Sequence, residues 1–350
     1  MRRKKKPSGL SRLLLPLIVF LIAVGVIAWM TTLFSPKDPS GNNPSGNTDT
    51  NIAIGTENGT ENPTTELEKK ELKALATSLF AEETFSAAYL AVYDVTAGVM
   101  LYEKDAQAKI TAASTTKLLT ALTLLEYVEQ DTIFTVGSEL SLVGAGSSSA
   151  DLVQGQKLTV EQILDALLIP SGNDASYVIA AHVGRNLSSD PQITDRDAVN
   201  VFLEKMNEKA KSLGVKNSLF TCPDGYPDGK QYTTAEDMML ISVAAAKNET
   251  IRKTVEKTYS EIVFPDGSTV GYVNTNLLMV PSSSYYYEGT FGMKTGSTPG
   301  AGQCLIAGAT AYDHDLIVAL FKANGNEGRY TDARKALDAG FEAVRQAQTK

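Results

Sequence analysis

The chain has 350 residues, of which 43% are hydrophobic and 21% are charged, and its formal net charge is -8. So much apolar content over this length excludes a wholly disordered chain and a miniprotein that depends on disulfides. Its two histidines, His182 and His314, leave little room for a histidine-based triad, and HExxH, Walker and paired CxxC motifs do not occur. We therefore expect neither a metal ion nor an organic cofactor.

The charge is unevenly distributed along the chain. Six basic residues and no acidic residue lie within residues 1–34, so the remaining 316 residues carry a net charge of -14. A nucleic-acid-binding protein presents a basic surface to its ligand. The acidic balance of the main body therefore argues against nucleic acid as a partner, and the basic cluster belongs to a membrane segment instead.

Residues 13–34 form an uncharged and almost wholly apolar run of 22 residues. As a helix, such a run spans about 33 Å, which is enough for a bilayer core of about 30 Å. A cleaved signal peptide, the alternative, has a shorter apolar region followed by a small-residue cleavage site, and no such site follows Trp29. We expect an uncleaved anchor, with residues 1–12 as a cytoplasmic basic segment that sends the rest of the chain outside the cell.

Residues 35–65 have the composition of a linker. Ser, Pro, Gly, Asn and Thr make up 23 of these 31 residues, which leaves too little apolar surface for a core. We expect a flexible extracellular linker, followed by one globular domain over residues 66–350. The protein is thus predicted to hold a catalytic or binding domain on the outer side of the cell membrane.

The globular region has strand-like patterns at both ends and helical patterns between them. Two β-rich runs joined through Thr96-Ala97-Gly98 predict a hairpin. The expected strands are 88–95, 99–102, 304–310 and 316–322, and the expected helices are 116–130, 160–169, 175–183, 202–213, 234–246 and 330–346. This order predicts an α+β fold in which the two chain ends join in one antiparallel sheet.

A Ser-x-x-Lys motif stands at the start of the first of these helices. Ser114 and Lys117 are three residues apart, so on a helix their side chains share one face and can form a hydrogen bond. A serine hydroxyl becomes an effective nucleophile when a neighbouring base takes its proton. Lysine can be that base if burial lowers its pKa by about 3 units. Taken alone, the motif is more often a helix-capping serine followed by a surface lysine.

Two further short motifs follow in the chain. Ser171-Gly172-Asn173 lies in a tight turn between two predicted helices, where it can direct a hydroxyl and a carboxamide into a cleft. Lys294-Thr295-Gly296 falls where a strand should precede the run that contains Cys304. A lysine and a threonine there can bind a carboxylate, and the glycine allows close backbone approach. Alone, each motif is ordinary, but the three in this order are much more specific.

Together the motifs resemble those of the D-alanyl-D-alanine carboxypeptidases, low-molecular-mass penicillin-binding proteins of the serine β-lactamase and DD-peptidase superfamily. The similarity runs over nearly all of residues 85–345. It is carried by the segments 113–118, 171–175, 206–207, 213–214, 232–238, 292–296 and 301–302. The resemblance implies the fold of that superfamily, in which an all-helical subdomain lies beside the sheet.

The resemblance also implies a reaction, which is removal of the terminal D-Ala from peptidoglycan stem pentapeptides through an acyl-enzyme. β-Lactam antibiotics would be covalent inhibitors. Ser114 would be the nucleophile and Lys117 its base. Ser171 would relay the proton to the leaving amine, and Asn173 would orient Lys117 and the peptide.

The substrate-binding residues implied by the resemblance lie on the later strand. Lys294 and Thr295 would hold the terminal carboxylate, with Gly296 beside them. The backbone N–H groups of Ser114 and Ser297 would form the oxyanion hole. One segment departs from the family pattern, because the usual Pro-x-Gly sequence is acidic here, with Asp224 at its centre.

Three further functions are compatible with these motifs. A β-lactamase of the same superfamily is disfavoured. One class of β-lactamase hydrolyses its acyl-enzyme with a Glu-x-x-Leu-Asn element, and this chain contains no Leu-Asn dipeptide. A DD-endopeptidase and a membrane-tethered β-lactam sensor that does not turn over substrate both stay open.

Cys222 and Cys304 are as compatible with a disulfide as with two buried thiols, and nothing in the pattern predicts an oligomeric state.

Overall fold

A computed structural model describes residues 64–226, 229–265 and 267–349 of the chain. The predicted cytoplasmic segment, the anchor at 13–34 and nearly all of the predicted linker lie outside these residues, and so the anchor stays a prediction. Within the described ranges, no helix combines the length and the apolar character needed to cross a bilayer.

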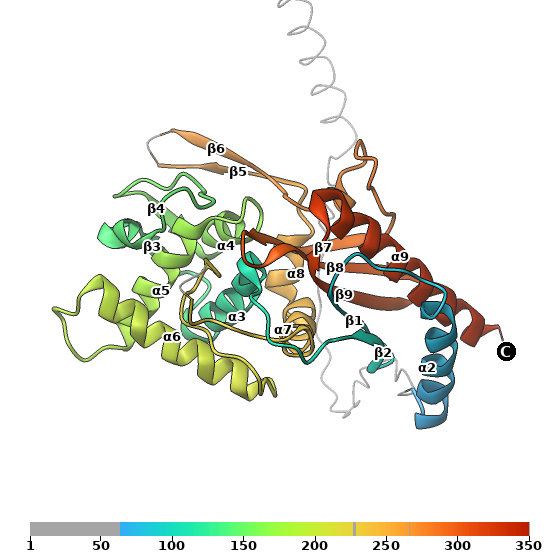
Figure 1. Cartoon of the computed structure of the whole chain (residues 1–350). Helices are drawn as coiled ribbons and strands as arrows, with labels where there is room; N and C mark the ends of the chain where they lie inside the picture. The colour runs from blue at the N-terminus through green and yellow to red at the C-terminus, as the bar shows by residue number, and fades with distance from the viewer. Residues whose placement is uncertain (1–63, 227–228, 266, 350) are drawn as a thin grey trace, which may run out of the picture. The chain divides into compact units, whose positions relative to one another are not determined.

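The centre of the domain is a five-stranded antiparallel sheet in the order β2-β1-β9-β8-β7 (Figure 1). Its strands are β1 (Tyr89–Asp94), β2 (Val99–Lys104), β7 (Thr290–Thr298), β8 (Gly302–Ala311) and β9 (His314–Ala323). The first strand of the chain pairs with the last, since β1 aligns with β9 from Tyr89↔Phe321 to Asp94↔Leu316. The predicted α+β fold, with one sheet built from both chain ends, is therefore confirmed.

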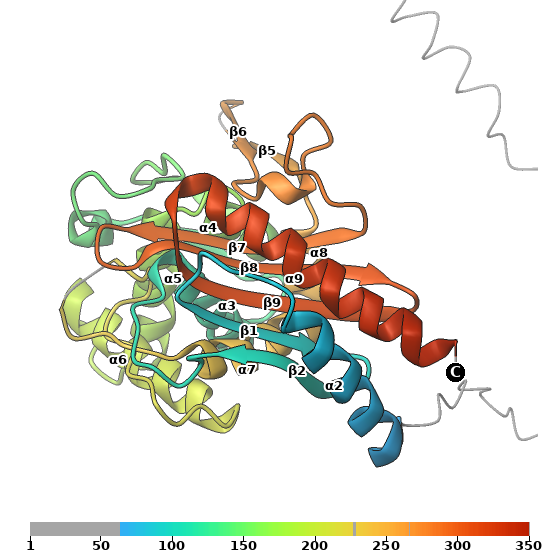
Figure 2. The same ribbon diagram turned by 45° about the vertical axis from the view of Figure 1, so that its right-hand side comes forward.

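Side chains of the central strands alternate between two cores, as the two-residue period of a strand requires. On β9, Val318 and Leu320 pack with the helices of one face, while Ile317 and Ala319 pack with those of the other. Two helices, α2 (Glu66–Phe80) and α9 (Gly325–Gln348), cover the first face. Figure 2 shows both helices lying across that face. Because both faces are covered, the central strands are apolar in their middle parts, from Cys304 to Ala309 on β8 and from Leu316 to Phe321 on β9.

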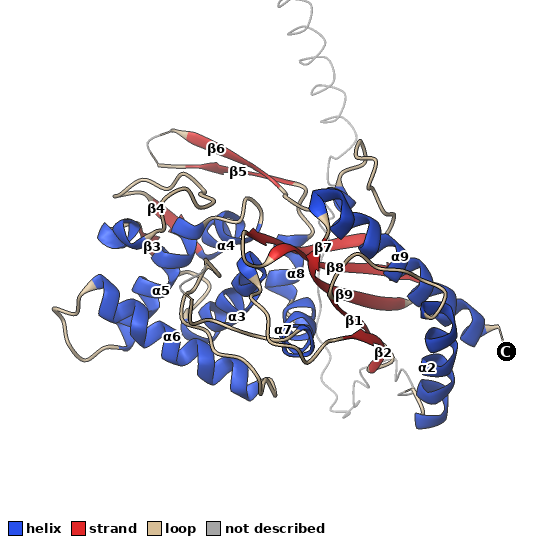
Figure 3. Ribbon diagram, in the orientation of Figure 1, coloured by secondary structure: helices blue, strands red, loops and turns tan. Residues whose placement is uncertain are grey.

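The second face of the sheet carries the helical part of the domain (Figure 3). Its helices are α3 (Lys117–Tyr127), α4 (Val160–Leu168), α5 (Asn173–Leu187), α6 (Asp195–Ser212), α7 (Ala235–Lys247) and α8 (Glu249–Val255). Every residue of α3 from Lys117 to Leu124 is buried, so this helix forms the centre of the core. A helix that is enclosed on all sides is rigid, and its first turn is a precise support for a reactive side chain.

The sequence patterns located most of the long elements, but they missed the 15-residue helix α2, the helix α8 and the short strands. All four expected strands and all six expected helices are present, although α6 begins seven residues and α9 five residues before the expected start. Two ribbons were not predicted, namely β3 (Ile133–Thr135) with β4 (Lys157–Thr159), and β5 (Tyr259–Val263) with β6 (Thr269–Val273). Strands of three to five residues are too short for a period to be recognised in the sequence. The helical part of the domain thus also contains two small ribbons.

Candidate active site

Ser114 and Lys117 occupy the entry to the central helix. Ser114 lies in a short 3₁₀ helix, η1 (Ala113–Thr116), and Lys117 is the first residue of α3. The Lys117 Nζ atom donates a hydrogen bond of 3.0 Å to the Ser114 hydroxyl. Ser114 is partly exposed, whereas Lys117 is completely buried. The hydroxyl is therefore accessible to a substrate while its neighbouring amine is shielded from water.

The Lys117 amine makes two further hydrogen bonds, both to acceptors from distant parts of the chain. It donates to the Asn173 side-chain oxygen at 2.7 Å and to the Asp224 backbone oxygen at 2.9 Å. Burial lowers the pKa of Lys117 to about 8, although the negative charge of Asp224 opposes that shift. An amine with this pKa is partly neutral near physiological pH, so it can accept the proton of Ser114.

The turn between α4 and α5 carries Ser171 and Asn173. Ser171 has a positive φ of 70°, a left-handed conformation that a residue with a side chain adopts only when its surroundings enforce it. Here the Gly172 N–H donates to the Ala166 oxygen at 3.0 Å, and the Asn173 N–H donates to the Ser148 oxygen at 2.9 Å. Ser171 is 6% exposed, and its hydroxyl makes no hydrogen bond to any described residue. It is thus free to bond to a substrate or a water molecule.

Lys294, Thr295 and Gly296 lie on β7, which passes directly over η1. A β-carbon on Gly296 would be 3.1 Å from the Ser114 backbone nitrogen, so the strand and the nucleophile segment are in close contact. Lys294 is 1% exposed, and its Nζ atom donates to the Thr295 backbone oxygen at 3.0 Å. Burial, reinforced by the positive charges of Lys117 and Arg329, lowers the pKa of Lys294 well below its ordinary value.

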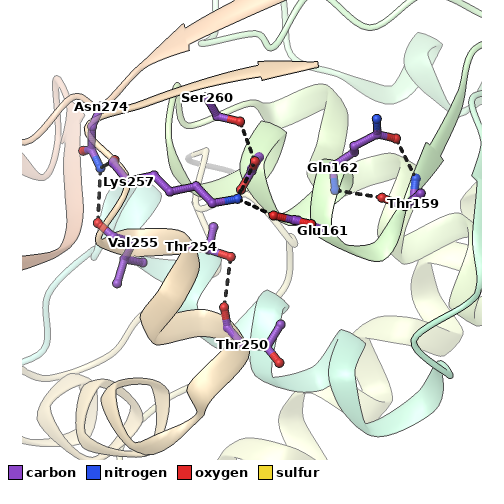
Figure 4. A network of polar contacts seen from close by, with 10 residues as sticks. Thr159, Glu161, Gln162, Thr250, Thr254, Val255, Lys257, Ser260 and Asn274 are labelled. Atoms are coloured by element: carbon purple, nitrogen blue, oxygen red, sulfur yellow. Dashed lines mark hydrogen bonds and ion pairs between the residues drawn. The ribbon is translucent and has the colours of Figure 1, made fainter. Parts of the chain in front are cut away.

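The Thr295 side chain is fixed by the segment that leads into β7. Its hydroxyl shares a hydrogen bond of 2.6 Å with the hydroxyl of Thr275. The neighbouring Asn274 donates to the Lys257 backbone oxygen at 2.9 Å, and the Lys257 amine forms ion pairs with Glu161 and Asp165 of α4. Figure 4 shows this network, which joins α4 to the β5–β6 ribbon through Ser260. Strand β7 is therefore tied to the helical part of the domain.

Comparison with known proteins agrees with this geometry. A family model described as D-alanyl-D-alanine carboxypeptidase, Peptidase_S11, matches residues 76–325. The chain belongs to this family. It is therefore a serine hydrolase of the D-alanyl-D-alanine carboxypeptidase class, and the family predicted from the three motifs is confirmed.

Relatives with sequences and structures extend the match over most of the domain. A D-alanyl-D-alanine carboxypeptidase of Streptomyces sp. (strain K15) is 36% identical over 253 residues, which are 70% of this chain and 83% of that protein. The carboxypeptidase DacF of Bacillus subtilis (strain 168) is 31% identical over 269 residues, 76% of this chain and 64% of DacF. The crystal structure of the Streptomyces K15 DD-transpeptidase has a TM-score of 0.67 and 32% identity, and covers 74% of this chain and 98% of its own.

The structure brings most of the predicted residues of this peptidase together. Ser114, Lys117 and Asn173 are joined by hydrogen bonds, and the strand that bears Lys294 lies against them. Ser297 is at the exposed end of the same strand, where its hydroxyl accepts a hydrogen bond of 3.1 Å from Gln303. The roles of these residues in the reaction stay predictions.

Two residues of this site were missed in the sequence. Ser148, in a loop rich in serine, donates to the Ser171 backbone oxygen at 2.7 Å and to the Asn173 side-chain oxygen at 3.3 Å. Arg329, on α9, reaches under β7 to the Gly296 oxygen at 3.4 Å, and its buried Nε has no partner among the described residues. A signal for Arg329 was available, because it shares a helix face with the buried Ala333. No comparable pattern marks Ser148.

The described residues contain no cluster of three or more His, Cys, Asp or Glu side chains that could hold a metal ion. Cys222 and Cys304 are both buried and are not joined to each other. Burial raises the pKa of the Cys304 thiol to about 12, which keeps that thiol protonated and unreactive.

Proposed function

We propose that the domain removes the C-terminal D-Ala from peptidoglycan stem pentapeptides by acyl transfer to Ser114. The observation that carries this proposal is the 3.0 Å hydrogen bond between the Ser114 hydroxyl and a fully buried Lys117 amine whose pKa is lowered to about 8. The names of the relatives point to the same peptide chemistry. A related penicillin-binding protein D2 of Listeria monocytogenes, in an ampicillin-bound form, supports β-lactams as covalent inhibitors.

In the acylation step, Ser114 Oγ attacks the carbonyl carbon of the penultimate D-Ala and its proton passes to Lys117 Nζ. The backbone N–H groups of Ser114 and Ser297 hold the resulting oxyanion, a type of interaction that contributes about 3–4 kcal/mol per donor. The Ser171 hydroxyl then passes the proton to the leaving amine as the C–N bond breaks. Asn173 holds the lysine in place throughout.

Two buried basic side chains set the preference for a free C-terminus. Lys294 donates a hydrogen bond to the Thr295 oxygen and Arg329 donates one to the Gly296 oxygen, and the Arg329 Nε has no partner in the described part of the chain. A substrate carboxylate at this position satisfies the guanidinium and offsets two like charges that repel each other. This arrangement favours a carboxypeptidase, because an internal peptide bond of a cross-link brings no such terminal carboxylate next to its scissile bond.

The decisive experiment is to measure D-Ala release from a diacyl-Lys-D-Ala-D-Ala peptide by the purified domain, and to label the same sample with fluorescent penicillin. We expect both turnover and a covalent adduct, which peptide mapping by mass spectrometry should place on Ser114. The Ser114→Ala variant should lose both. Labelling that persists in that variant would show that Ser114 is not the nucleophile. A penicillin adduct in the unmodified domain without release of D-Ala would instead indicate a β-lactam sensor.

We also propose that the domain is held at the outer face of the cell membrane by a single helix over residues 13–34. The support is the uncharged length of this segment and the basic cluster before it. Deleting residues 1–34 should move the protein from the membrane fraction to the soluble one. An unchanged membrane fraction would contradict the anchor.

A further inference from the structure

A turn over residues 222–226 is docked onto the segment that carries the nucleophile. Its Asp224 backbone oxygen accepts the hydrogen bond from Lys117 at 2.9 Å. The next residue, Gly225, has a φ of 79°, and a β-carbon on it would be only 1.9 Å from the Ala113 oxygen. Only glycine fits this contact, so the turn lies in a fixed position directly beside the Ser114–Lys117 pair.

The side chain of Asp224 is incompletely satisfied by hydrogen bonds. Asp224 is 0% exposed, and its Oδ1 atom accepts one hydrogen bond, from the Tyr226 N–H at 2.9 Å. Its Oδ2 atom is buried and has no hydrogen-bond partner among the residues that the structure describes. A buried carboxylate oxygen without a donor costs free energy, unless a nearby positive charge stabilises it.

Three ionisable side chains raise the pKa of the Lys117 amine, namely Asp224, Cys222 and Asp174, and Lys117 in turn lowers the pKa of Lys294. They differ in how far their charge is already compensated. Hydrogen bonds from several donors stabilise the Asp174 carboxylate and compensate its charge. The donors are Ser149 Oγ, Ala150 N, Leu152 N and Ala175 N. Lys294 is a second buried amine, and a positive charge on Lys117 lowers its pKa. Asp224 is the carboxylate in this group that retains an uncompensated oxygen.

We propose that Asp224 is a positioning residue for acylation, because its buried carboxylate is the counter-charge of the ammonium that Lys117 becomes when it takes the Ser114 proton. This inference rests on the proposed function. The Ser114 Oγ–H bond breaks and the proton joins Lys117 Nζ. The Oγ–carbon bond forms as the π electron pair of the substrate carbonyl moves to its oxygen, and Asp224 takes no part in the proton transfer. Without this carboxylate, the new cation would stand beside Lys294, and Asp174, whose charge is already compensated, would be the remaining carboxylate that acts on it.

The test is the pH dependence of acylation in Asp224→Asn, which keeps the shape of the side chain and an oxygen for the Tyr226 N–H. Acylation needs the neutral amine of Lys117, so its rate in the unmodified protein should rise with pH and level off above the pKa of this group. Removing the negative charge should move this rise to lower pH by about one unit. The rate at the plateau should fall about tenfold, since the cation formed in the transition state loses its partner.

Two variants serve as controls. Asp224→Glu restores the charge and should return the rise in rate towards its original pH. Asp237→Asn removes another buried carboxylate, one that accepts hydrogen bonds from the backbone of residues 216 and 217 and does not act on Lys117. This variant should change thermal stability without changing the pH at which the acylation rate rises. If Asp224→Asn does not fold, the smaller neutral variant Asp224→Ser replaces it.

The outcomes separate the inference from the proposed function. The inference would be overturned if the Asn or Ser variant has a lower acylation rate at the plateau but its rate rises at an unchanged pH. That result would show that Asp224 only shapes the turn. A shift to higher pH would also overturn the inference. An unmodified protein that forms no adduct at Ser114, or whose rate does not rise with pH, would instead remove the proposed function.

Discussion

Gly296 of β7 lies so close to the nucleophile segment that a β-carbon on it would be 3.1 Å from the Ser114 nitrogen and 3.1 Å from the Ala112 oxygen. Both neighbours are backbone atoms, which cannot rotate away as a side chain can. The Ser114 N–H is one of the two donors proposed for the oxyanion hole. The glycine of the Lys-Thr-Gly motif therefore determines the distance between β7 and the segment that carries Ser114.

This contact predicts the effect of Gly296→Ala. The added methyl group should displace β7 from η1 by a few tenths of an ångström and misalign the oxyanion hole. We expect acylation by penicillin to slow by about tenfold or more, with a loss of stability of about 1 kcal/mol. Stopped-flow labelling and thermal unfolding measure the two effects. An acylation rate within a factor of two of the original would show that the contact is not critical.

Lys294→Ala should weaken the capture of a free carboxylate. The variant removes one of two buried cations beside the Thr295–Gly296 backbone, and a hydrogen bond to a charged group contributes about 1.5–3 kcal/mol. We expect kcat/KM for diacyl-Lys-D-Ala-D-Ala to fall about 10- to 100-fold, mainly through KM. The same peptide with a C-terminal amide is the control, since its already low kcat/KM should change little. Equal losses for the two peptides would contradict the role of Lys294.

Ser148→Ala should loosen the Ser171–Asn173 turn. Its hydroxyl bonds to the Ser171 oxygen at 2.7 Å and to the Asn173 side chain at 3.3 Å, so its loss frees the amide that orients Lys117. We expect a several-fold lower kcat and a loss of stability of about 1 kcal/mol. Ser147→Ala is the matched control, because the Ser147 hydroxyl bonds to the Gly144 oxygen within the same loop. Identical kinetics in the two variants would exclude the positioning role.

The ion pair between His314 and Asp94 predicts a pH dependence of stability that is separate from catalysis. His314 Nδ1 is 2.6 Å from the fully buried Asp94 carboxylate, and this hydrogen bond raises the pKa of His314 above its ordinary value. A raised pKa in the folded state stabilises the protein below the unfolded pKa of about 6.5. The contribution is lost as the pH rises through the folded pKa.

The His314→Gln variant should therefore lower the melting temperature at pH 6 and have less effect at pH 9. Thermal unfolding across this range measures the difference between the two proteins. D-Ala release should be unaffected, because His314 begins β9 at the end of the sheet opposite to the Gly302 end of β8, next to the site. A difference in melting temperature that is constant from pH 6 to 9 would mean that the pair does not titrate.

Most of the long elements and the three motifs could be predicted because they depend on local chemistry, although the 15-residue helix α2 was missed. The hydrophobic periods located α3, α7, β8 and β9, since a helix or strand repeats its buried positions at fixed intervals. The spacing of Ser114 and Lys117 determined that their side chains can meet on one turn. The short ribbons β3–β4 and β5–β6 could not be found in this way, because three to five residues do not define a period.

By itself, the amino-acid sequence determined which residues can react, since the Ser-x-x-Lys spacing and the order of the motifs are local properties of the chain. Only the tertiary structure decided whether they do so. Complete burial of Lys117 lowers its pKa, and that burial depends on Asn173 and Asp224, which are far from it along the chain. Desolvation arises when distant segments exclude water together, and a local pattern of residues does not contain this information.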